Sequence, residues 1–454
     1  MSNTFYITTP IYYVNDKPHI GHAYTTILAD VLARYHRNTE KKTFFLTGLD
    51  EHGQKVQQAA EERGIEPQQH CDEMAPRFIE LWEQLHISHD DFIRTTEERH
   101  KKVVRDILQQ VMDKGDIYEA EYEGLYSVSE ERFITEKEAE SGEFRDIKQL
   151  KEKNYFFKMS KYQQALIDHI KSNPKFIQPD HRKNEILGFL RQPLNDLCIS
   201  RPKSRLNWGI ELPFDSDYVT YVWFDALINY ITAPGFGRDE ESFNKWWPAS
   251  YHLIGKDILT THAVYWPTML MSAGIELPKT IFAHGWWLMG ESKMSKSLGN
   301  VINPMDLIDD YGVDPVRYYL MREMVLGQDS SFTMESFIQR YNSDLANDFG
   351  NLLSRVSTLM KKNYDGKIPE PGDFTEAETV IKSNGESLGE VVKEKIESMR
   401  LNEAIEEIMQ YIRSVNKYME NNAPWKLVKE DKDAAGRVLY TAGEALRIGA
   451  VLLS

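Results

Sequence analysis

The chain has 454 residues, of which 41% are hydrophobic and 11% aromatic, so it can form about two to four domains with sizeable cores. No apolar run approaches the length of a membrane span, and the first ten residues carry no secretory signal. The only two cysteines, Cys71 and Cys198, exclude a disulfide framework and a cysteine-based zinc site, and they predict a cytoplasmic protein. The net charge of −16 argues mildly against a nucleic-acid partner, although a local basic groove is compatible with it.

The first half of the chain reads as alternating strands and helices, which is typical of an α/β fold with a parallel sheet. We expect helices over residues 20–35, 68–85 and 97–114, and strands over residues 5–9, 43–47, 219–224, 251–254 and 280–283. Between about residues 117 and 212 the pattern changes to short β-like pieces rich in tyrosine and phenylalanine. This change predicts an insertion that splits the α/β core.

Several of the predicted strands end in small or polar residues. The endings are Thr8-Thr9-Pro10, Gly48-Leu49-Asp50, Gly255-Lys256-Asp257 and His284-Gly285. Glycine and aspartate often do no more than terminate a strand. In an open parallel sheet, however, ligands bind just beyond the carboxyl ends of the strands, so four such endings favour a binding site.

After about residue 300 the chain becomes helical. Apolar residues recur at three- and four-residue spacing over 343–362, 376–399 and 401–421, and a connecting loop is expected over 366–374. This end of the chain is predicted to be an α-helical bundle.

The motif His19-Ile20-Gly21-His22 opens the first predicted helix. Its two histidines are three residues apart, so both imidazoles fall on one face, beside the free N–H groups and positive dipole end that suit a phosphate. Gly21 removes a side chain where a flat base could lie against the backbone. An isolated motif of this kind is also compatible with a simple helix cap.

A second motif, Lys293-Met294-Ser295-Lys296-Ser297, lies in a glycine-flanked segment. Two lysines on such a loop can meet the charge that develops on a polyphosphate leaving group. The alternative is a solvated basic turn.

HIGH followed much later by KMSKS resembles the signature of class I aminoacyl-tRNA synthetases, and the resemblance covers almost the whole chain. It implies a Rossmann-like catalytic core, attack of an amino-acid carboxylate on the ATP α-phosphate, and transfer to a tRNA 3′ end. It further implies that His19 and His22 stabilise the α-phosphate, and that Lys296, with Lys293, meets the departing pyrophosphate. Catalysis would then rest on positioning and electrostatics.

The segments Ile199-Ser200-Arg201-Pro202 and Asn207-Trp208-Gly209-Ile210 look like those shared by the methionine, isoleucine, leucine and valine enzymes. The insertion is too short for the editing domain of the last three, which compensates for the roughly 1–3 kcal/mol of discrimination that one methylene provides. The thioether of methionine can instead be recognised by aromatic contacts. The chain is therefore most similar to the methionyl-tRNA synthetases, which attach methionine to tRNA.

The resemblance to the methionyl enzymes implies a set of substrate-binding residues. Asp50 would hold the substrate ammonium group, and the side-chain pocket would be lined by Ile11, Tyr13, Trp223, Leu227, Tyr230, His262 and Trp266. ATP would be bound by His19, Gly21, His22, Gly255, Asp257, His284, Gly285, Trp287 and Lys296. The position before His262, usually aromatic in these enzymes, is Thr261 here, which can reshape the pocket lid.

Two expectations concern metals. Magnesium would arrive with ATP, because no carboxylate cluster resembles a dedicated site. Many methionyl enzymes carry a cysteine zinc knuckle in the insertion, but Tyr126-Ser127-Val128-Ser129 lacks the thiols, so no zinc is expected.

In the helical half, Asn351, Arg355 and Trp425 resemble the anticodon-reading residues of the methionyl enzymes. Unstacked RNA bases are read by aromatic stacking and by hydrogen bonds to their edges, so Trp425 would stack on the first base of a CAU anticodon of tRNA(Met). Without the catalytic motifs, a packing tryptophan and a solvated arginine would be the preferred interpretation.

The expected organisation is a first half of the core over 1–116, the insertion over 117–212, the second half of the core over 213–292, the KMSKS loop and stem-contact region over 293–342, and the anticodon-binding bundle over 343–454. The chain stops within an apolar periodic segment, so a truncated or shortened bundle is expected, in a monomer that binds no membrane. Two alternatives stay open: a class I synthetase for valine or leucine, and a catalytically silent relative that only binds tRNA.

Overall fold

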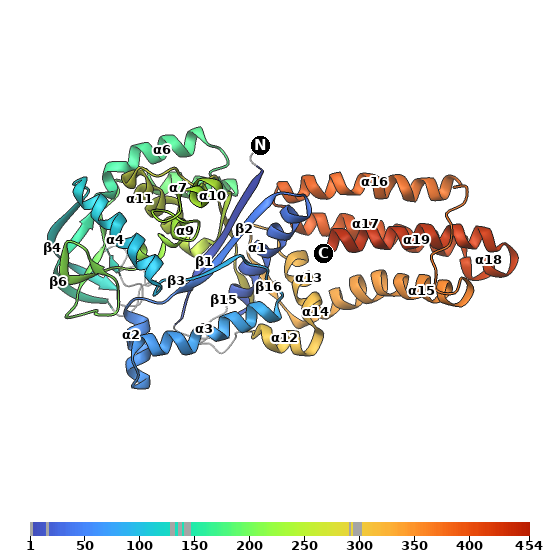
Figure 1. Cartoon of the computed structure of the whole chain (residues 1–454), viewed down its shortest axis with the longest axis horizontal. Helices are drawn as coiled ribbons and strands as arrows, with labels where there is room; N and C mark the ends of the chain where they lie inside the picture. Colours follow the sequence, from blue (N-terminus) through green and yellow to red (C-terminus); the bar gives the residue numbers. More distant parts are fainter. Residues whose placement is uncertain are drawn as a thin grey trace. The chain divides into compact units, whose positions relative to one another are not determined.

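The computed structural model describes residues 3–14, 18–127, 132–134, 139, 147–289, 292–293 and 302–454. The chain divides into two compact units, Met1–His284 and Gly285–Ser454, and each is described by itself (Figure 1). Within the described residues, no helix is long and apolar enough to cross a membrane.

The first unit is built around a six-stranded sheet in the order β3-β2-β1-β12-β13-β7, and every neighbouring pair in it is parallel. Its strands are β1 (Thr4–Tyr13), β2 (Lys42–Asp50), β3 (Asp91–Arg94), β7 (Ile177–Gln178), β12 (Tyr251–Gly255) and β13 (Ile281–His284). The chain winds outward from β1 in one direction to β2 and β3, and in the other to β12 and β13. The strand order therefore reverses between β1 and β12, where open α/β sheets bind ligands.

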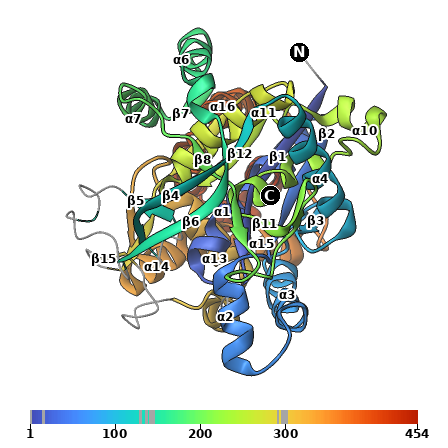
Figure 2. The same cartoon turned by 90° about the vertical axis from the view of Figure 1, so that its left-hand side faces the viewer.

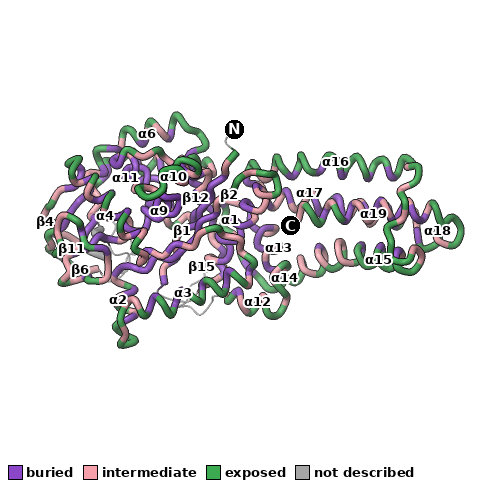
Figure 3. The backbone as a smooth tube through the Cα atoms, in the orientation of Figure 1, coloured by how far each residue is buried: buried purple, intermediate pink, exposed green. Residues whose placement is uncertain are grey.

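Helices cover this sheet and the insertion. They are α1 (Ile20–Asn38), α2 (Gln54–Arg63), α3 (Pro67–Gln84), α4 (Glu98–Asp113), α6 (Gln163–Ser172), α7 (Asp180–Phe189), α8 (Trp223–Ala226), α9 (Asn229–Thr232), α10 (Glu240–Trp246) and α11 (Trp266–Ala273). Helix α1 packs on β1, β2 and β12, and these elements form a buried layer, purple in Figure 3. One hydrophobic cluster joins residues from distant parts of the chain, including Leu46, Phe157, Ile254 and Trp266.

Strand β1 is longer than predicted, since it continues through Pro10 to Tyr13. Its register with β2 shifts between Thr8 and Ile11, which marks a β-bulge. A bulge re-aims the side chains that follow it, and Ile11 and Tyr13 therefore extend from a strand beyond the predicted end at residue 9.

The predicted insertion begins with β4 (Ile117–Ser127), which pairs along its whole length with β6 (Ile147–Phe157) in antiparallel orientation (Figure 2). This pair belongs to the four-stranded sheet β5-β4-β6-β8, and a second sheet has the order β10-β11-β9. The remaining strands are β5 (Arg132–Ile134), β8 (Leu197–Cys198), β9 (Ser200–Pro202), β10 (Glu211–Leu212) and β11 (Asp215–Thr220). The strand predicted over 219–224 is wrong in its second half, because β11 ends at Thr220 and the chain turns into α8 at Trp223.

The second unit begins with a small sheet, β15-β14-β16, and continues as a helical bundle. Its strands are β14 (Trp287–Met289), β15 (Ser292–Lys293) and β16 (Ser330–Phe332), and its helices are α12 (Pro304–Tyr311), α13 (Val313–Glu323), α14 (Met334–Arg340), α15 (Asn351–Asn363), α16 (Glu376–Glu397), α17 (Leu401–Asn422), α18 (Pro424–Glu430) and α19 (Lys432–Leu453). Between α14 and α15 lies a π-helical segment, Tyr341–Gly350. Leu352, Ile408, Ile412, Leu439 and Ala442 form part of the bundle core.

The predicted fold class is confirmed: a parallel-sheet α/β core interrupted by an insertion, followed by a helical bundle. The helices predicted from hydrophobic spacing begin and end within a few residues of α1, α3, α4, α16 and α17. The finer domain boundaries given above remain predictions.

Candidate active site

The two histidines of the HIGH motif stack on each other at the start of α1. His19 is the N-cap, its Nδ1 accepts the Gly21 N–H at 3.0 Å, and His22 Nδ1 accepts the His19 N–H at 3.3 Å. The ring centroids are 3.8 Å apart and the rings are nearly parallel. The prediction that both imidazoles share one face is therefore confirmed, and both lie where a helix favours an anion.

Gly21 lies directly against the His19 ring. A Cβ atom at Gly21 would lie 2.9 Å from Cε1 of His19, closer than such atoms normally approach. This glycine therefore leaves room for the His19 ring, and its expected place beside a base stays a prediction.

Helix α1 is tied to the sheet on both sides of the strand reversal. On one side, the Tyr12 hydroxyl lies 2.8 Å from Oγ1 of Thr26, and burial raises the pKa of Tyr12 to about 12. On the other side, Thr25 Oγ1 lies 2.7 Å from Nε2 of His284, the last residue of β13. These contacts hold the HIGH motif beside the carboxyl ends of β1 and β13.

The predicted ATP-binding residues of the first unit meet at adjacent strand ends. Gly255 ends β12 and is the register partner of His284 on β13. A Cβ atom at Gly255 would lie 2.5 Å from Oδ1 of Asp257, so the carboxylate of Asp257 lies against this glycine. The structure therefore brings Gly255, Asp257 and His284 together.

Asp50 is the last residue of β2 and the register partner of Tyr13, so two predicted methionine-binding residues lie side by side. The adjoining carboxylate, Glu51, is buried and accepts a hydrogen bond from Nε of Arg94 at 2.6 Å. Burial raises the pKa of Glu51, and Arg94 partly opposes that rise. A Cβ atom at Gly53 would lie 2.2 Å from the Tyr13 hydroxyl, which explains a glycine after Glu51 and His52.

Three of the predicted pocket residues form one buried aromatic group with His252 of β12. Nε2 of His262 lies 2.8 Å from the Tyr230 hydroxyl, and Nδ1 lies 2.9 Å from the carbonyl oxygen of Ile258. Trp266 Nε1 lies 3.2 Å from Nε2 of His252, whose ring centroid is 4.2 Å from that of Tyr230. Burial lowers the pKa of His262 to about 4, so this ring is neutral near pH 7.

The other predicted pocket residues lie on neighbouring elements. Trp223 begins α8 and Leu227 follows it, while Ile11 lies on β1 beyond the bulge. Ile11 and Trp223 pack against the same hydrophobic cluster that contains Leu227 and Tyr230. Thr261 is buried and begins a π-helical turn over Thr261–Tyr265, one residue before His262.

Sequence reasoning missed a buried carboxylate, Asp225, on α8 between Trp223 and Leu227. Asp225 accepts hydrogen bonds from Nδ1 of His52 at 2.7 Å and from Nε2 of His100 at 2.8 Å. Burial alone would raise the pKa of Asp225, but attraction to His52 and the two hydrogen bonds hold it at about 2. The available signal was an aspartate within the otherwise apolar segment 221–228. Its two partners are distant in sequence: His52 follows β2 and His100 lies on α4.

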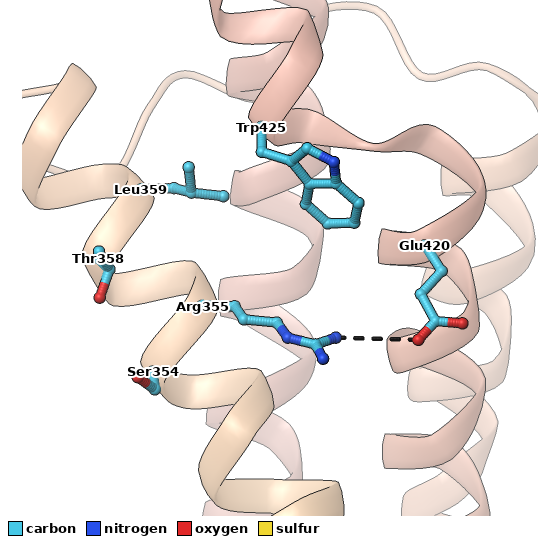
Figure 4. Close-up of a pocket in the computed structure, with 6 residues that line it drawn as sticks. All are labelled: Ser354, Arg355, Thr358, Leu359, Glu420 and Trp425. Atoms are coloured by element: carbon cyan, nitrogen blue, oxygen red, sulfur yellow. Dashed lines mark ion pairs between the residues drawn. The ribbon is translucent and has the colours of Figure 1, made fainter.

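In the second unit, a hollow of about 630 Å³ lies between α15, α17 and α18 (Figure 4). It is lined by Ser354, Arg355, Thr358, Leu359, Glu420 and Trp425. Arg355 Nη1 lies 3.9 Å from Oε1 of Glu420, and Trp425 is 40% exposed. Arg355 and Trp425 are distant in sequence and were both predicted to read the anticodon, and they face the same hollow. Asn351, the third predicted residue, lies one turn earlier on α15 and is not part of the lining.

Two predicted ATP-binding residues also belong to the second unit. A Cβ atom at Gly285 would lie 1.9 Å from the carbonyl oxygen of Gln328, so only glycine fits there. Trp287 is buried and lies beside Tyr319 and Phe332. Lys296 lies outside the described residues, as do Val128 and Ser129 of the expected zinc-knuckle position, and of Lys293 only the backbone is described.

No group of three or more histidine, cysteine or acidic residues among the described residues could hold a metal ion. Cys71 is buried and Cys198 half-buried, and both are free thiols. The described residues therefore do not fit a zinc site.

A family profile described as "tRNA synthetases class I (M)" matches residues 5–144 and 141–357. Together with the parallel sheet and the stacked histidines at its crevice, this match defines a class I aminoacyl-tRNA synthetase. A second profile, "Anticodon binding domain of methionyl tRNA ligase", matches residues 368–454.

Curated relatives and a solved structure indicate which class I synthetase family the chain resembles. The chain is 48% identical to the methionine–tRNA ligase of Clostridium tetani, over 99% of this chain and 71% of that protein, and 47% identical to that of Thermotoga maritima, over 97% and 71%. It superposes on Mycobacterium tuberculosis methionyl-tRNA synthetase in complex with methionyl-adenylate with a TM-score of 0.95 at 41% identity, covering 100% of this chain and 91% of that one. The chain belongs to the methionyl-tRNA synthetase family.

Proposed function

We propose that this chain is a methionine–tRNA ligase. It activates L-methionine with ATP to methionyl-adenylate, releases pyrophosphate, and transfers the methionyl group to the 3′ end of tRNA(Met). The observation that carries the proposal is the stacked pair His19 and His22 at the N-terminus of α1, beside the end of β13. Imidazole N–H groups and a helix N-terminus both favour the negative charge that builds up on the α-phosphate.

The reaction needs the methionine carboxylate and the ATP α-phosphate to meet in line. Asp50 at the end of β2 would hold the methionine ammonium group, and Gly255, Asp257 and His284 would hold the ribose and adenine. Gly21, Gly285 and Trp287 would contribute backbone or packing around the nucleotide, and Lys293 and Lys296 would meet the departing pyrophosphate. The chain's contribution is positioning and electrostatic stabilisation, without a covalent enzyme intermediate.

The methionine side chain would enter the aromatic group formed by Tyr230, His262 and Trp266, with Ile11, Tyr13, Trp223 and Leu227 completing the pocket. Sulfur–aromatic contacts provide about 0.3–1.5 kcal/mol each, and a wall of several rings therefore favours a thioether over a shorter aliphatic chain. Because His262 is neutral near pH 7, the pocket presents no charge to this side chain.

ATP would enter as its magnesium complex, with the ion held by the nucleotide's phosphates as part of the substrate. The described residues offer no carboxylate cluster for a separate site. We propose no role for zinc. As an enzyme of translation, the chain would work as a monomer in the cytoplasm. Light scattering of the purified protein tests the oligomeric state, and localisation of a tagged chain tests the compartment.

The hollow of the second unit would receive the first base of the CAU anticodon. Trp425 offers a half-exposed aromatic face for stacking, and Arg355 offers donors to a base edge. Asn351, one turn away on α15, would contact a neighbouring nucleotide.

The deciding experiment is ATP–pyrophosphate exchange with each amino acid, followed by charging of tRNA(Met) transcripts. We expect methionine alone to support efficient exchange. Exchange with leucine or valine but not methionine would refute methionine as the substrate. Normal tRNA binding without exchange for any amino acid would show that the chain is a catalytically silent relative that only binds tRNA.

A further inference from the structure

His252 is a fully buried histidine on β12 that contacts two residues of the proposed methionine pocket, Tyr230 and Trp266. Its Nδ1 lies 2.8 Å from Oγ1 of Thr8 on the adjacent strand, where the two residues are register partners. Its Nε2 lies 3.2 Å from Nε1 of Trp266, and its ring lies beside the ring of Tyr230 at 4.2 Å between centroids. One side chain of the sheet therefore contacts two rings of the pocket.

The partners determine which nitrogen of His252 carries the proton. An indole N–H can only donate, so Nε2 of His252 is the acceptor for Trp266. The neutral ring then carries its proton on Nδ1 and donates it to the Thr8 hydroxyl, which can accept. Both nitrogens are thereby used, and the imidazole is held in one orientation by partners on β1 and α11.

The same logic applies to the second histidine of the group. The carbonyl of Ile258 can only accept, so Nδ1 of His262 donates to it and Nε2 accepts from the Tyr230 hydroxyl. Tyr230 is further held through its backbone carbonyl, which accepts from the Tyr6 hydroxyl at 2.8 Å. Tyr230 thus has polar anchors at both ends, whereas the indole N–H of Trp266 is anchored by its bond to His252.

We propose that His252 is a positioning residue for methionine recognition: it fixes the plane of the Trp266 ring, and supports that of Tyr230, without touching the substrate. The inference rests on the proposed function and adds a residue to it. Strand β12 connects the two proposed sites. It carries His252 beside the methionine pocket and ends in Gly255 at the nucleotide site.

The test compares three substitutions of His252 in the full chain by methionine-dependent ATP–pyrophosphate exchange. His252→Phe keeps a ring against Tyr230 but removes both nitrogens. The amide of His252→Gln reaches the place of Nε2 and can accept from Trp266, whereas that of His252→Asn reaches only the place of Nδ1. We expect the KM for methionine to rise about tenfold in the Phe and Asn variants, because an indole N–H loses its buried acceptor. The Gln variant should stay within about threefold of wild type, and the KM for ATP should be unchanged in all three.

A double-mutant cycle tests whether His252 acts through Trp266. Trp266→Phe removes the donor, so His252→Phe in that background should raise the KM for methionine less than about twofold further. Additive effects of the two substitutions would overturn the proposal. Equal KM values for the Gln and Asn variants would also overturn it.

Leu253→Ala is the matched control, since Leu253 is equally buried on β12 but points to the opposite face of the sheet. It should lower the melting temperature while leaving the KM for methionine unchanged. A parallel rise in the KM for methionine in Leu253→Ala would show that general destabilisation, and not positioning, explains the His252 variants. If wild type fails to exchange with methionine at all, the proposed function fails; if wild type exchanges and His252→Phe has a normal KM, only the inference fails.

Discussion

The hydroxyl of Thr25 lies 2.7 Å from Nε2 of His284, so the second turn of α1 is bonded to the last residue of β13. Thr25→Val keeps the shape and removes the bond. Since a buried hydrogen bond contributes about 1 kcal/mol, the KM for ATP in the exchange reaction should rise about fivefold with little change for methionine. Thr39→Val, at the exposed C-cap of the same helix, is the control. An equal rise in the KM for methionine would contradict a role confined to the nucleotide.

Replacing Gly21 with alanine should impair chemistry more than folding. The added Cβ would lie 2.9 Å from the movable Cε1 of His19, so the ring shifts while the backbone stays. Because losing one transition-state donor costs about 10²–10³ in rate, kcat for exchange should fall by about that factor. Gly188→Ala on α7, where a Cβ meets no atom within 4 Å, should leave kcat unchanged. A large fall in melting temperature for Gly21→Ala would indicate a folding defect instead.

Lys296→Ala should reduce adenylate formation by about 10²–10³-fold, since its ammonium group would meet charge that develops only as pyrophosphate departs. The dissociation constant for methionine, measured by equilibrium dialysis, should change little. If the affinity for methionine falls in proportion to the rate, Lys296 stabilises the bound substrate and not the transition state, which would contradict this prediction.

Trp425→Ala should separate the two half-reactions. Base stacking on an aromatic ring contributes about 1–3 kcal/mol, so kcat/KM for tRNA(Met) should fall by about 5- to 150-fold while methionine-dependent exchange is unaffected. Leu353→Ala is a suitable control, because Leu353 is exposed on α15 and does not line the hollow. Equal losses in exchange and charging would contradict the anticodon role.

Stability should depend on pH through His262. Burial lowers its pKa to about 4 in the folded chain, against 6.5 for the ordinary side chain. Between these values the unfolded chain binds the proton and the folded chain does not. His262 therefore contributes roughly 3 kcal/mol to the free energy of unfolding above pH 6.5, and this contribution is lost as the pH falls towards 4.

Urea unfolding between pH 7.5 and 4.5 measures this dependence. His262→Gln should flatten part of it, whereas His181→Gln, at an exposed position on α7, should not. A wild-type curve that is flat between pH 6.5 and 5 would contradict the assignment.

Local patterns predicted much of the fold and of the site. The HIGH histidines could be placed because they lie one turn apart at a helix start, and the strand endings at Asp50, Gly255 and His284 could be placed because parallel strands share an edge. The bonds from His252 could not, since Thr8 and His252 are 244 residues apart in sequence and only the sheet register makes them neighbours.

One local pattern was misleading, and one contact had no local signal. The apolar run at 219–224 has no polar alternation to separate a strand from a buried helical turn, and the chain forms α8 there. Glu420 is exposed on α17, and nothing in the local sequence predicts that it faces Arg355 across the hollow. Its position depends on how α15 packs with α17, which the spacing along one helix does not determine.

The π-helical segment Tyr341–Gly350 has a further consequence for the residues that follow it. A π-helix takes more residues per turn than an α-helix, so the angular phase of α15 relative to α14 is set by how these ten residues wind. One residue corresponds to about 100° of rotation in an α-helix. Rewinding the segment by a single position would therefore point Arg355 away from the indole of Trp425. The pitch of this stretch thus determines which side of α15 faces the hollow.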